Sequence, residues 1–552
     1  MKFLQKSWLA GIVLGISLPL LTFSEGRSQQ HWCTDEARVK QALEQAIEKF
    51  AACDRAAVPA LIAALRDGNS FIRWQAANAL AQISLQDEGA IPRLVAALGD
   101  EAVSVRSGAV DALAQIGRSS DAAVPALIAA LQDRDANVRE MAVFALKNIG
   151  QQAQAAAPEL IVLLNADESL SVRALAADAL AYLGGETQKR AIPVLIAALQ
   201  QDSSSLVRRR AAISLGKIGA ETQGVGSNLI VPALRTTFKA KEETSVRVIA
   251  AGALGHMEEA AKAAIPDLLV ALQHDEDAVR VMAANVLGKM GGDPQVIVPA
   301  LMATLTNDNN AFARVGAVNS LERMAEDARA AIPVLLAILA DENDGNLRSR
   351  VAVALGRIGV EAKTVVPALI ATFEKDEDIS ARMTAAAALG RFGKEANAAV
   401  PTLLAALKQE EPDLRISAIA ALGRIAPNHP KLLPALETAL NDSSVIVRSM
   451  AVQVLGTLGA DAQPAVPQLI AALEDEMPVR VAAANALVQI IQGLHEQAIT
   501  PEDLQTTKTI ALSVQQALQG TADEKAKQQV EEILNAIDAG EFLPSASPYR
   551  CC

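Results

Sequence analysis

Apolar residues recur at helical spacing in pairs of short segments along most of the chain. In one such pair, Val124, Leu127, Ile128 and Leu131 lie three or four positions apart, and residues 138–149 repeat this spacing. A polar stretch over residues 132–137 separates the two segments. The pattern predicts two short amphipathic helices joined by a polar turn. Neither helix could bury its apolar face alone, so we expect such pairs to pack against one another.

The same unit recurs along the sequence. It opens with a phrase like Ala-Val-Pro-Ala-Leu-Ile-Ala-Ala-Leu, whose proline returns at steps of 33 to 35 residues, apart from one step of 39 between Pro193 and Pro232. An arginine follows each proline by 13 to 15 residues, and an aspartate usually stands about six residues before that arginine. Each unit closes with a phrase like Leu-Gly-Lys-Ile-Gly. The thirteen prolines are at positions 59, 92, 125, 158, 193, 232, 266, 299, 333, 367, 401, 434 and 467.

Proline and glycine mark the expected helix ends. Proline fits the first turn of the first helix, where its missing N–H costs nothing. Glycine at the end of the second helix is a natural C-cap. The glycines at this position are Gly117, Gly150, Gly184, Gly219, Gly359, Gly393 and Gly459.

Stacked units of this kind predict an all-α fold, a right-handed α-α superhelix of about 13 helical-hairpin repeats over residues 57–492. The low aromatic content of 3%, in a chain that is 51% hydrophobic, agrees with close helix-on-helix packing. We expect an N-terminal capping helix within residues 27–56, C-terminal capping helices over 493–540 and a disordered tail over 541–552.

The N-terminus is typical of a secretory signal. Lys2 and Lys6 precede an apolar stretch over residues 8–23, which is shorter than the roughly 20 residues that span a membrane. We therefore predict a signal peptide over residues 1–26 and export to the periplasm or a comparable lumen. The alternative is an uncleaved membrane anchor.

In an oxidising compartment Cys33 and Cys53 could form a disulfide or remain thiols. No role is assigned to Cys551 and Cys552.

Charge and chemistry argue against several function classes. The formal net charge of −13 makes nucleic acid a poor partner. The five histidines are not at metal-ligand spacing, and neither a phosphate-binding loop nor a serine nucleophile motif occurs. We therefore predict no enzyme activity, no catalytic residue, no metal and no cofactor.

The proline, aspartate, arginine and Leu-Gly-basic landmarks resemble the HEAT repeats, and most closely the subtype named after the phycobilisome lyases. The resemblance implies an armadillo-type solenoid in which aspartate and arginine form a buried ladder between repeats. Glu242 and Glu243 in the sixth repeat, and Glu410 and Glu411 in the eleventh, depart from the pattern and leave the ladder open there. The rungs expected from the resemblance are Asp100 with Arg106, Asp133 with Arg139 and Asp442 with Arg448.

Two enzyme families share this repeat type. Deoxyhypusine hydroxylases hold iron through several His-Glu pairs, whereas this chain has the single pair His495-Glu496. Phycobilin lyases act on a chromophore assembly on the cytoplasmic side, which a signal peptide contradicts. The resemblance therefore concerns the scaffold and carries no activity with it.

One position in the closing phrase is basic in seven consecutive repeats, and we call these residues the basic row. Such a row could dock an acidic partner segment or an anionic glycan. Alternatively, each cation only interacts with the macrodipole at a helix C-terminus. The basic row consists of Lys217, His256, Lys289, Arg323, Arg357, Arg391 and Arg424.

The extra residues near 220–230 lengthen one repeat. They predict either a binding loop or a neutral hinge.

The function predicted from the sequence is an exported, non-catalytic scaffold or adaptor that binds a protein partner, with an acidic segment as the candidate ligand. The alternatives are a lyase-like or chaperone-type protein acting on a small cofactor or chromophore, and a compliant mechanical spacer. No nucleic acid is expected to bind, and a membrane would be contacted only through an uncleaved signal segment.

Overall fold

The computed structural model describes Ala76 and residues 91–118, 121–222, 226–341, 343–498, 500–519 and 523–539. The predicted signal peptide, the N-terminal capping helix over 27–56, the landmarks of the first repeat, all four cysteines and the tail over 541–552 lie outside these residues. Every regular element in the described part of the chain is a helix. The prediction of an all-α solenoid of helical hairpins is therefore confirmed.

Each described repeat contains a first helix, here called the A helix, which carries the recurring proline. The A helices are α5 (Ile91–Ala97), α7 (Val124–Ala130), α9 (Ala157–Ala166), α11 (Gly185–Gln201), α13 (Ser227–Lys239), α15 (Ile265–His274), α17 (Pro294–Asn307), α19 (Ile332–Asp341), α21 (Ala362–Lys375), α23 (Val400–Ala406), α25 (Leu432–Ala439) and α27 (Val466–Ala471).

The second helix of each repeat, the B helix, carries the recurring arginine. The B helices are α6 (Val103–Gly117), α8 (Ala136–Ile149), α10 (Leu170–Leu180), α12 (Ser205–Glu221), α14 (Thr244–His256), α16 (Asp277–Leu287), α18 (Ala311–Met324), α20 (Gly345–Ile358), α22 (Ile379–Phe392), α24 (Pro412–Ile425), α26 (Val445–Leu458) and α28 (Met477–Gln497).

Short 3₁₀ segments connect many B helices to the next A helix. Such segments are η4 (Asp121–Ala123), η5 (Gly150–Ala156), η6 (Glu258–Ala264), η7 (Ala325–Ala331), η8 (Gly393–Ala399) and η9 (Gly459–Ala465), while η10 (Ala472–Glu474) follows α27.

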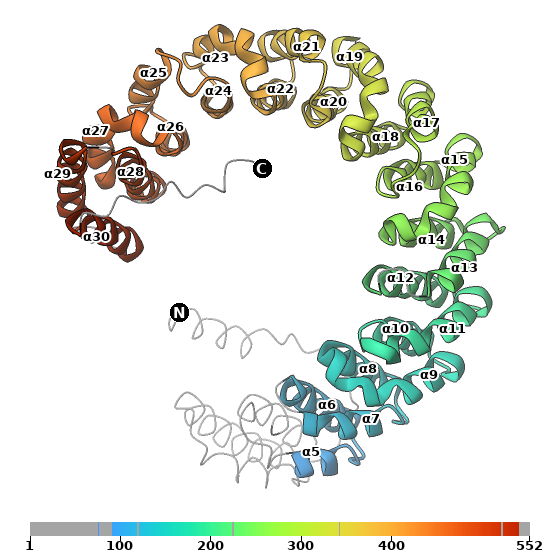
Figure 1. The fold of residues 1–552 in the computed structure, drawn as a ribbon. Coiled ribbons are helices and arrows are strands. Elements are labelled where there is room, and N and C mark those ends of the chain that lie inside the picture. Colours follow the sequence, from blue (N-terminus) through green and yellow to red (C-terminus); the bar gives the residue numbers. More distant parts are fainter. Residues whose placement is uncertain are drawn as a thin grey trace, which may run out of the picture. The chain divides into compact units, whose positions relative to one another are not determined.

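The chain divides into two compact units, residues 1–160 and residues 161–552. Within the second unit the helices form two layers, with the B helices on the inner side and the A helices on the outer side (Figure 1). Successive B helices of this unit pack directly against one another. The inner layer is therefore a continuous surface to which each repeat adds one helix.

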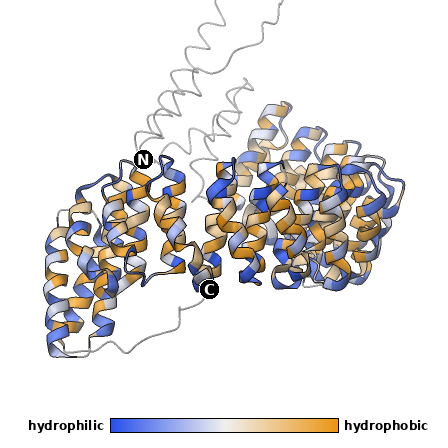
Figure 2. Cartoon of the chain, turned by 90° about the horizontal axis from the view of Figure 1, so that it is seen from above, coloured by the Kyte–Doolittle hydropathy of each residue, from blue (hydrophilic) through white to orange (hydrophobic). Residues whose placement is uncertain are grey.

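The core lies between the two layers and consists mainly of Ala, Leu, Val and Ile. Figure 2 shows that the helices carry both hydrophobic and hydrophilic residues, as expected when only one face is buried. The largest fully buried side chains include Phe238 and Phe373, at the ends of α13 and α21. Leu254, Leu321 and Leu389, from the closing phrases, are also completely buried. The leucine of that phrase is thus a core residue.

The predicted positions of proline and glycine are only partly correct. Proline lies in the first turn of α7, α15, α23 and α27, but α11, α13, α17 and α21 begin one or more turns earlier and enclose theirs. Gly150, Gly359, Gly393 and Gly459 do cap B helices with positive φ. The other three predicted caps are wrong: Gly117 is the last residue of α6 and Arg118 is its cap, Gly219 lies inside α12, and Gly184 precedes α11.

Two further helices follow the last repeat. Helix α28 continues to Gln497, past the predicted boundary at residue 492. Helix α29 (Pro501–Leu518) begins with a capping box in which the side chains of Thr500 and Asp503 each accept a bond from the other residue's backbone N–H. Helix α30 (Glu524–Asp538) packs against α28 and α29. These helices cover the end of the stack, as terminal elements of a solenoid must.

One described stretch, Val445–Glu474, is long and apolar enough to cross a membrane by composition. It is not one straight helix, because it contains α26, η9, α27 and η10. The capping Gly459 and the following Pro464 and Pro467 divide it. Leu455 and Leu469 from this stretch are fully buried in the core, so it belongs to the solenoid.

Candidate binding surface on the B helices

A ladder of arginine–aspartate pairs aligns successive B helices. In a complete rung, two guanidinium nitrogens donate to the two carboxylate oxygens of the aspartate that precedes the next B helix. The nitrogens are Nε and one terminal nitrogen, except in Arg247, which uses both terminal nitrogens. The donor–acceptor distances run from 2.6 to 3.1 Å, apart from the Arg247–Asp275 pair. The bidentate pairs are Arg106–Asp133, Arg173–Asp202, Arg247–Asp275, Arg280–Asp308, Arg348–Asp376, Arg415–Asp442 and Arg448–Asp475.

The ladder differs from the pairing expected from the resemblance. Asp100 and Arg106 were expected to pair, as were Asp133 with Arg139 and Asp442 with Arg448. Instead, the carboxylates of Asp133 and Asp442 bind Arg106 and Arg415, the arginines of the preceding repeats. The arginine still contacts the aspartate of its own repeat, because Nη1 of Arg448 donates to the backbone carbonyl of Asp442 over 2.9 Å. One guanidinium therefore joins two consecutive turns, which a pair within one repeat could not do.

Burial and hydrogen bonding oppose each other at these aspartates. Burial alone would raise the pKa of Asp376, but bonds from Arg348 and from the backbone N–H of Asp378 outweigh it and hold the pKa below its ordinary value. At Asp308 the hydrogen bond from Arg280 is the largest influence, and the pKa is again lowered. These two rungs are therefore charged pairs at neutral pH.

The ladder is altered at the two places where the sequence departs from the pattern. Arg208 forms a single ion pair with Glu242 at 3.2 Å, and its Nε is buried without a hydrogen-bond partner. In the eleventh repeat neither predicted glutamate takes the aspartate position. The amide oxygen of Gln409 accepts from Arg382 over 2.7 Å, which makes that rung neutral on one side.

The glycine of the closing phrase allows successive B helices to approach closely. A Cβ on Gly356 would lie 2.8 Å from Cα of Ala388, and a Cβ on Gly288 would lie 2.5 Å from Cα of Ser320. Both distances are shorter than non-bonded carbon atoms tolerate. Gly288 and Gly356, which precede Lys289 and Arg357, are therefore packing requirements at their two helix contacts.

The basic row lies at the C-terminal ends of the B helices. On α20, the exposed residues Asn346, Arg350 and Arg357, with half-buried Val353 between them, form one stripe facing away from the core. His256, Arg323, Arg391 and Arg424 are exposed at the corresponding end of their helices, and Lys217 and Lys289 are half-buried. The structure therefore brings the predicted residues to one edge of the inner layer, one per helix.

Lys217 differs from the rest of the row because its charge is already neutralised. Its Nζ forms an ion pair with Glu221 one turn later on α12 and lies 4.5 Å from the centre of the Tyr182 ring. Glu221 also accepts from Gln188, a buried side chain of α11. The ammonium group thus belongs to a local cluster that links the turn after α10 to α11 and α12.

The five cations from Lys289 to Arg424 differ from Lys217 in their surroundings. Among the described residues, no acidic side chain pairs with Lys289, Arg323, Arg357, Arg391 or Arg424. Arg391 donates to the backbone carbonyl of Val353 on the preceding B helix over 3.3 Å. The Cδ atom of Arg424 lies 3.5 Å from where a Cβ on Gly390 would stand, so this side chain also leans over the preceding helix. We call these five residues the open row.

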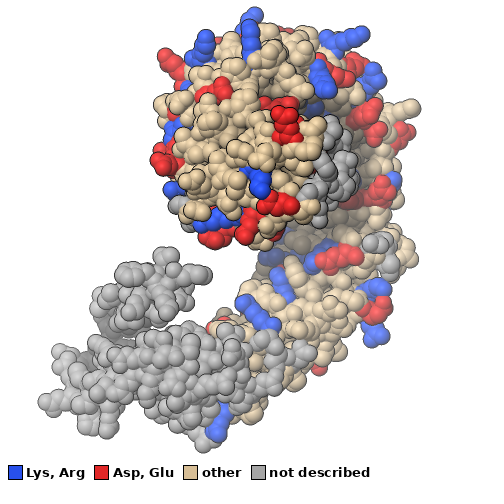
Figure 3. Space-filling model, turned by 60° about the vertical axis from the view of Figure 1, so that its left-hand side comes forward, with Lys and Arg blue, Asp and Glu red and all other residues tan. Residues whose placement is uncertain are grey.

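Charges elsewhere are mixed in sign. Figure 3 shows Lys and Arg interspersed with Asp and Glu over the described part of one face. Many of the basic groups outside the row are paired, as Arg235 is with Asp267 and Arg329 with Glu361. A run of five positions that are basic in consecutive repeats, without an acidic partner, is therefore a distinct feature in this acidic protein.

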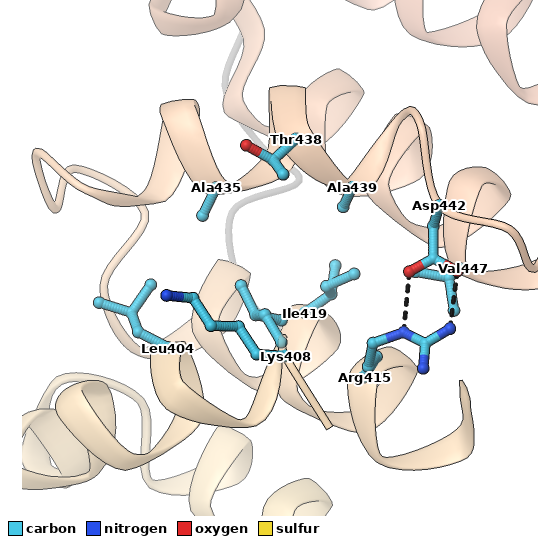
Figure 4. A pocket seen from close by; sticks show the side chains of 10 residues that line it. Leu404, Lys408, Arg415, Ile419, Ala435, Thr438, Ala439, Asp442 and Val447 are labelled. Carbon is cyan, nitrogen blue, oxygen red and sulfur yellow. Dashed lines mark hydrogen bonds and ion pairs between the residues drawn. The ribbon is translucent and has the colours of Figure 1, made fainter. Parts of the chain in front are cut away.

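A small pocket lies beside the ladder, between helices α23 to α26. Figure 4 shows the Arg415–Asp442 rung at one end of it and Leu404 and Lys408 at the other. Its remaining lining is mostly apolar and includes Ile419 and Val447. It contains no group of acid, base and nucleophile, so it offers space for an apolar side chain but no catalytic arrangement.

The extra residues of the sixth repeat lie partly outside the described residues, at 223–225. On the described side, α12 extends to Glu221, and α13 begins at Ser227 after Gly226, which has φ of +87°. The described flanks of the insertion therefore lie at the end of α12 and the start of α13, whereas Arg208 and Glu242 meet at the opposite end of these two helices. Within the described residues, no three His, Cys, Asp or Glu side chains are placed to hold a metal ion.

Comparisons with known proteins agree with this architecture. The family model described as HEAT repeats matches residues 34–114, 91–181, 157–225, 231–322, 332–423, 366–456 and 400–488. No curated protein matches the sequence.

Among solved structures, importin beta in a polyethylene glycol condition is 15% identical with a TM-score of 0.62, covering 98% of this chain and 83% of its own. Importin beta in an ammonium sulfate condition is 15% identical with a TM-score of 0.60, covering 88% and 74%. The Kap95:Nup1 complex is 15% identical with a TM-score of 0.53, covering 94% and 72%. These likenesses concern the fold.

Proposed function

Because this chain belongs to the HEAT-repeat family, we propose that it is a non-catalytic scaffold that binds a protein partner through the inner layer of B helices. The observation that carries the proposal is the open row, five exposed or half-buried cations on consecutive helices that have no acidic partner in the described part of the chain. A cation that only stabilises its own helix end gains roughly 0.3–1 kcal/mol and needs no alignment with its neighbours. Aligned cations create a local positive field that attracts an acidic ligand.

The solved relatives support a protein as the partner. The structure of Kap95 is of a complex with Nup1, which shows that a fold of this shape can hold another protein. The surface of the open row is long and carries few large apolar side chains, as expected for a ligand that lies along several repeats. We infer that the partner presents an acidic segment to this surface.

We further propose that the protein works outside the cytoplasm. This part rests on the N-terminal sequence, in which two lysines precede an apolar stretch that is too short to span a membrane comfortably. Fractionation with protease protection, followed by determination of the mature N-terminus, tests it. A protein found in the cytoplasm with residue 2 intact would contradict export and would leave the binding proposal in place.

The binding proposal is tested by reversing two charges in the middle of the open row. Arg357→Glu with Arg391→Glu should abolish the crosslinking of a stoichiometric protein partner in cells, identified by mass spectrometry, with unchanged helix content by circular dichroism. The matched control reverses two exposed lysines on the outer helix α21, Lys363→Glu with Lys375→Glu. Unchanged crosslinking in the row variant, or a purified protein that carries a chromophore or metal, would overturn the proposal.

A further inference from the structure

The open row also constrains the conformation of its ligand, an inference that rests on the proposed function. The row repeats once per B helix, and packed helices usually lie about 8–10 Å apart. Gly288 and Gly356 allow such direct packing at two of the four steps of the row. A ligand that meets every cation must therefore present one negative charge on the same side about every 9 Å. This distance distinguishes the regular conformations of a peptide.

A polyproline II segment has this repeat. It has three residues per turn and rises about 3.1 Å per residue, so every third side chain returns to the same side after about 9.3 Å. In a β-strand, side chains on one face repeat every two residues, at about 6.6–6.8 Å, and drift out of register with the row. An extended strand with alternating acidic residues would therefore meet some cations and miss others.

An α-helix fits less well because of the surface beside the row. Its side chains return to one face after seven residues, about 10.5 Å, but helices bind in grooves that accept an apolar face. The residues next to the open row are Val353 on α20, Ala387 on α22 and Ala420 on α24. The described large apolar side chains exposed on the B helices α16, α18, α20, α22 and α24 are Phe312 and Ile379. Both stand at the opposite end of their helices, roughly 17 Å from the row.

The geometry points to an acidic polyproline II segment as the ligand, with Asp or Glu at every third position. Five cations separated by four steps require about 13 residues of such a segment. Polyproline II backbone is fully solvated and needs no strand edge or deep groove. The arginines supply planar, multivalent donors for carboxylates, and Arg391 is already held over the neighbouring helix by its bond to the carbonyl of Val353.

Three fluorescent peptides test this inference against the full chain, with binding followed by anisotropy at several salt concentrations. The first has 13 residues with Asp at positions 1, 4, 7, 10 and 13 and Pro or Ser between them. The second has the same composition with its five Asp residues contiguous. The third is a longer helical peptide with Glu at every seventh position. The first should bind about tenfold more tightly than the second, because contiguous charges cannot reach more than two of the cations at once.

Binding of the first peptide should fall at least about tenfold in the variant Arg357→Gln with Arg391→Gln, and should weaken with salt. It should be unchanged in the control Lys363→Gln with Lys375→Gln. Equal affinity for the spaced and contiguous peptides, or tighter binding of the helical peptide or of dextran sulfate, would overturn the polyproline II assignment. If none of the peptides binds while the charge reversal still abolishes partner crosslinking, the assignment fails and the scaffold function stands.

Discussion

We call the contact between two successive B helices a joint. The α20–α22 joint and the α22–α24 joint connect helices of the same length, but different side-chain bonds hold them together. The first has the bidentate rung Arg348–Asp376, whose side chains are 13% and 5% exposed. The second has one hydrogen bond from Arg382 to the neutral amide of Gln409. The helices also approach each other more closely at the glycine of the first joint than at the glycine of the second. A Cβ on Gly356 would lie 2.8 Å from the next helix, whereas a Cβ on Gly390 would lie 3.4 Å from Cα of Ala421.

This difference shows that one repeat pattern produces joints of unequal strength. In a solenoid each repeat contacts only its neighbours, so local stability depends on the individual interfaces. We expect the α22–α24 joint, and the α12–α14 joint with its single Arg208–Glu242 pair, to open more often than the joints with complete rungs. Compliance would then be concentrated at particular places along the stack.

The largest effect is expected from Arg348→Ala. It leaves the buried carboxylate of Asp376 without its cation, and the loss of one partner of a buried ion pair typically costs about 3–5 kcal/mol. Hydrogen exchange of the amides in α20 and α22 should report this as lower local protection. As a control, Arg329→Ala removes a largely exposed pair with Glu361 and should cost less than about 1 kcal/mol. Similar losses in the two variants would contradict a structural role for the rung.

An intermediate effect that depends on pH is expected from Asp376→Asn. The amide would turn N–H donors toward the guanidinium, and the loss of a hydrogen bond to a charged group costs about 1.5–3 kcal/mol at pH 7. In the wild type the pKa of Asp376 is lowered by folding, so the rung stabilises the fold above the carboxyl's unfolded pKa. That stability is lost as the pH falls through the lower folded value.

The difference in the free energy of unfolding between the wild type and Asp376→Asn should therefore shrink below about pH 4, where the carboxyl group of the unfolded chain begins to bind protons. Urea unfolding followed at pH 7, 4 and 2.5 measures it. A difference that stays constant over this range would show that the charge of Asp376 does not contribute.

The smallest effect is expected from strengthening the weaker joint. Gln409→Asp gives Arg382 a carboxylate and lets the side chain accept the N–H two residues later, as Asp376 does at the other joint. We expect a gain of about 1 kcal/mol in the local stability of α22 and α24. Gln409→Asn is the matched control, since it has the shape of Asp without the charge. An equal gain from both would assign the effect to side-chain length.

Much of the fold follows from local sequence alone. The alternation of apolar segments and polar turns, with proline opening one helix and Leu-Gly closing the next, predicted the helical hairpins and their order. The same repeat register placed the seven residues of the basic row at one position of consecutive B helices. Residues at the same position of successive repeats occupy equivalent places in a regular stack. The prediction of export rests on the N-terminal sequence only.

The tertiary structure decided which groups meet. The sequence places Asp442 six residues before Arg448, yet its carboxylate binds Arg415 of the preceding repeat, because the stacking distance, and not the distance along the chain, sets the pairing. It also decided that Gln409 takes the aspartate position and that Lys217 is neutralised by Glu221 while the open row is not. Periodicity determines which face of a helix a residue occupies, but contacts between repeats depend on how closely the helices pack.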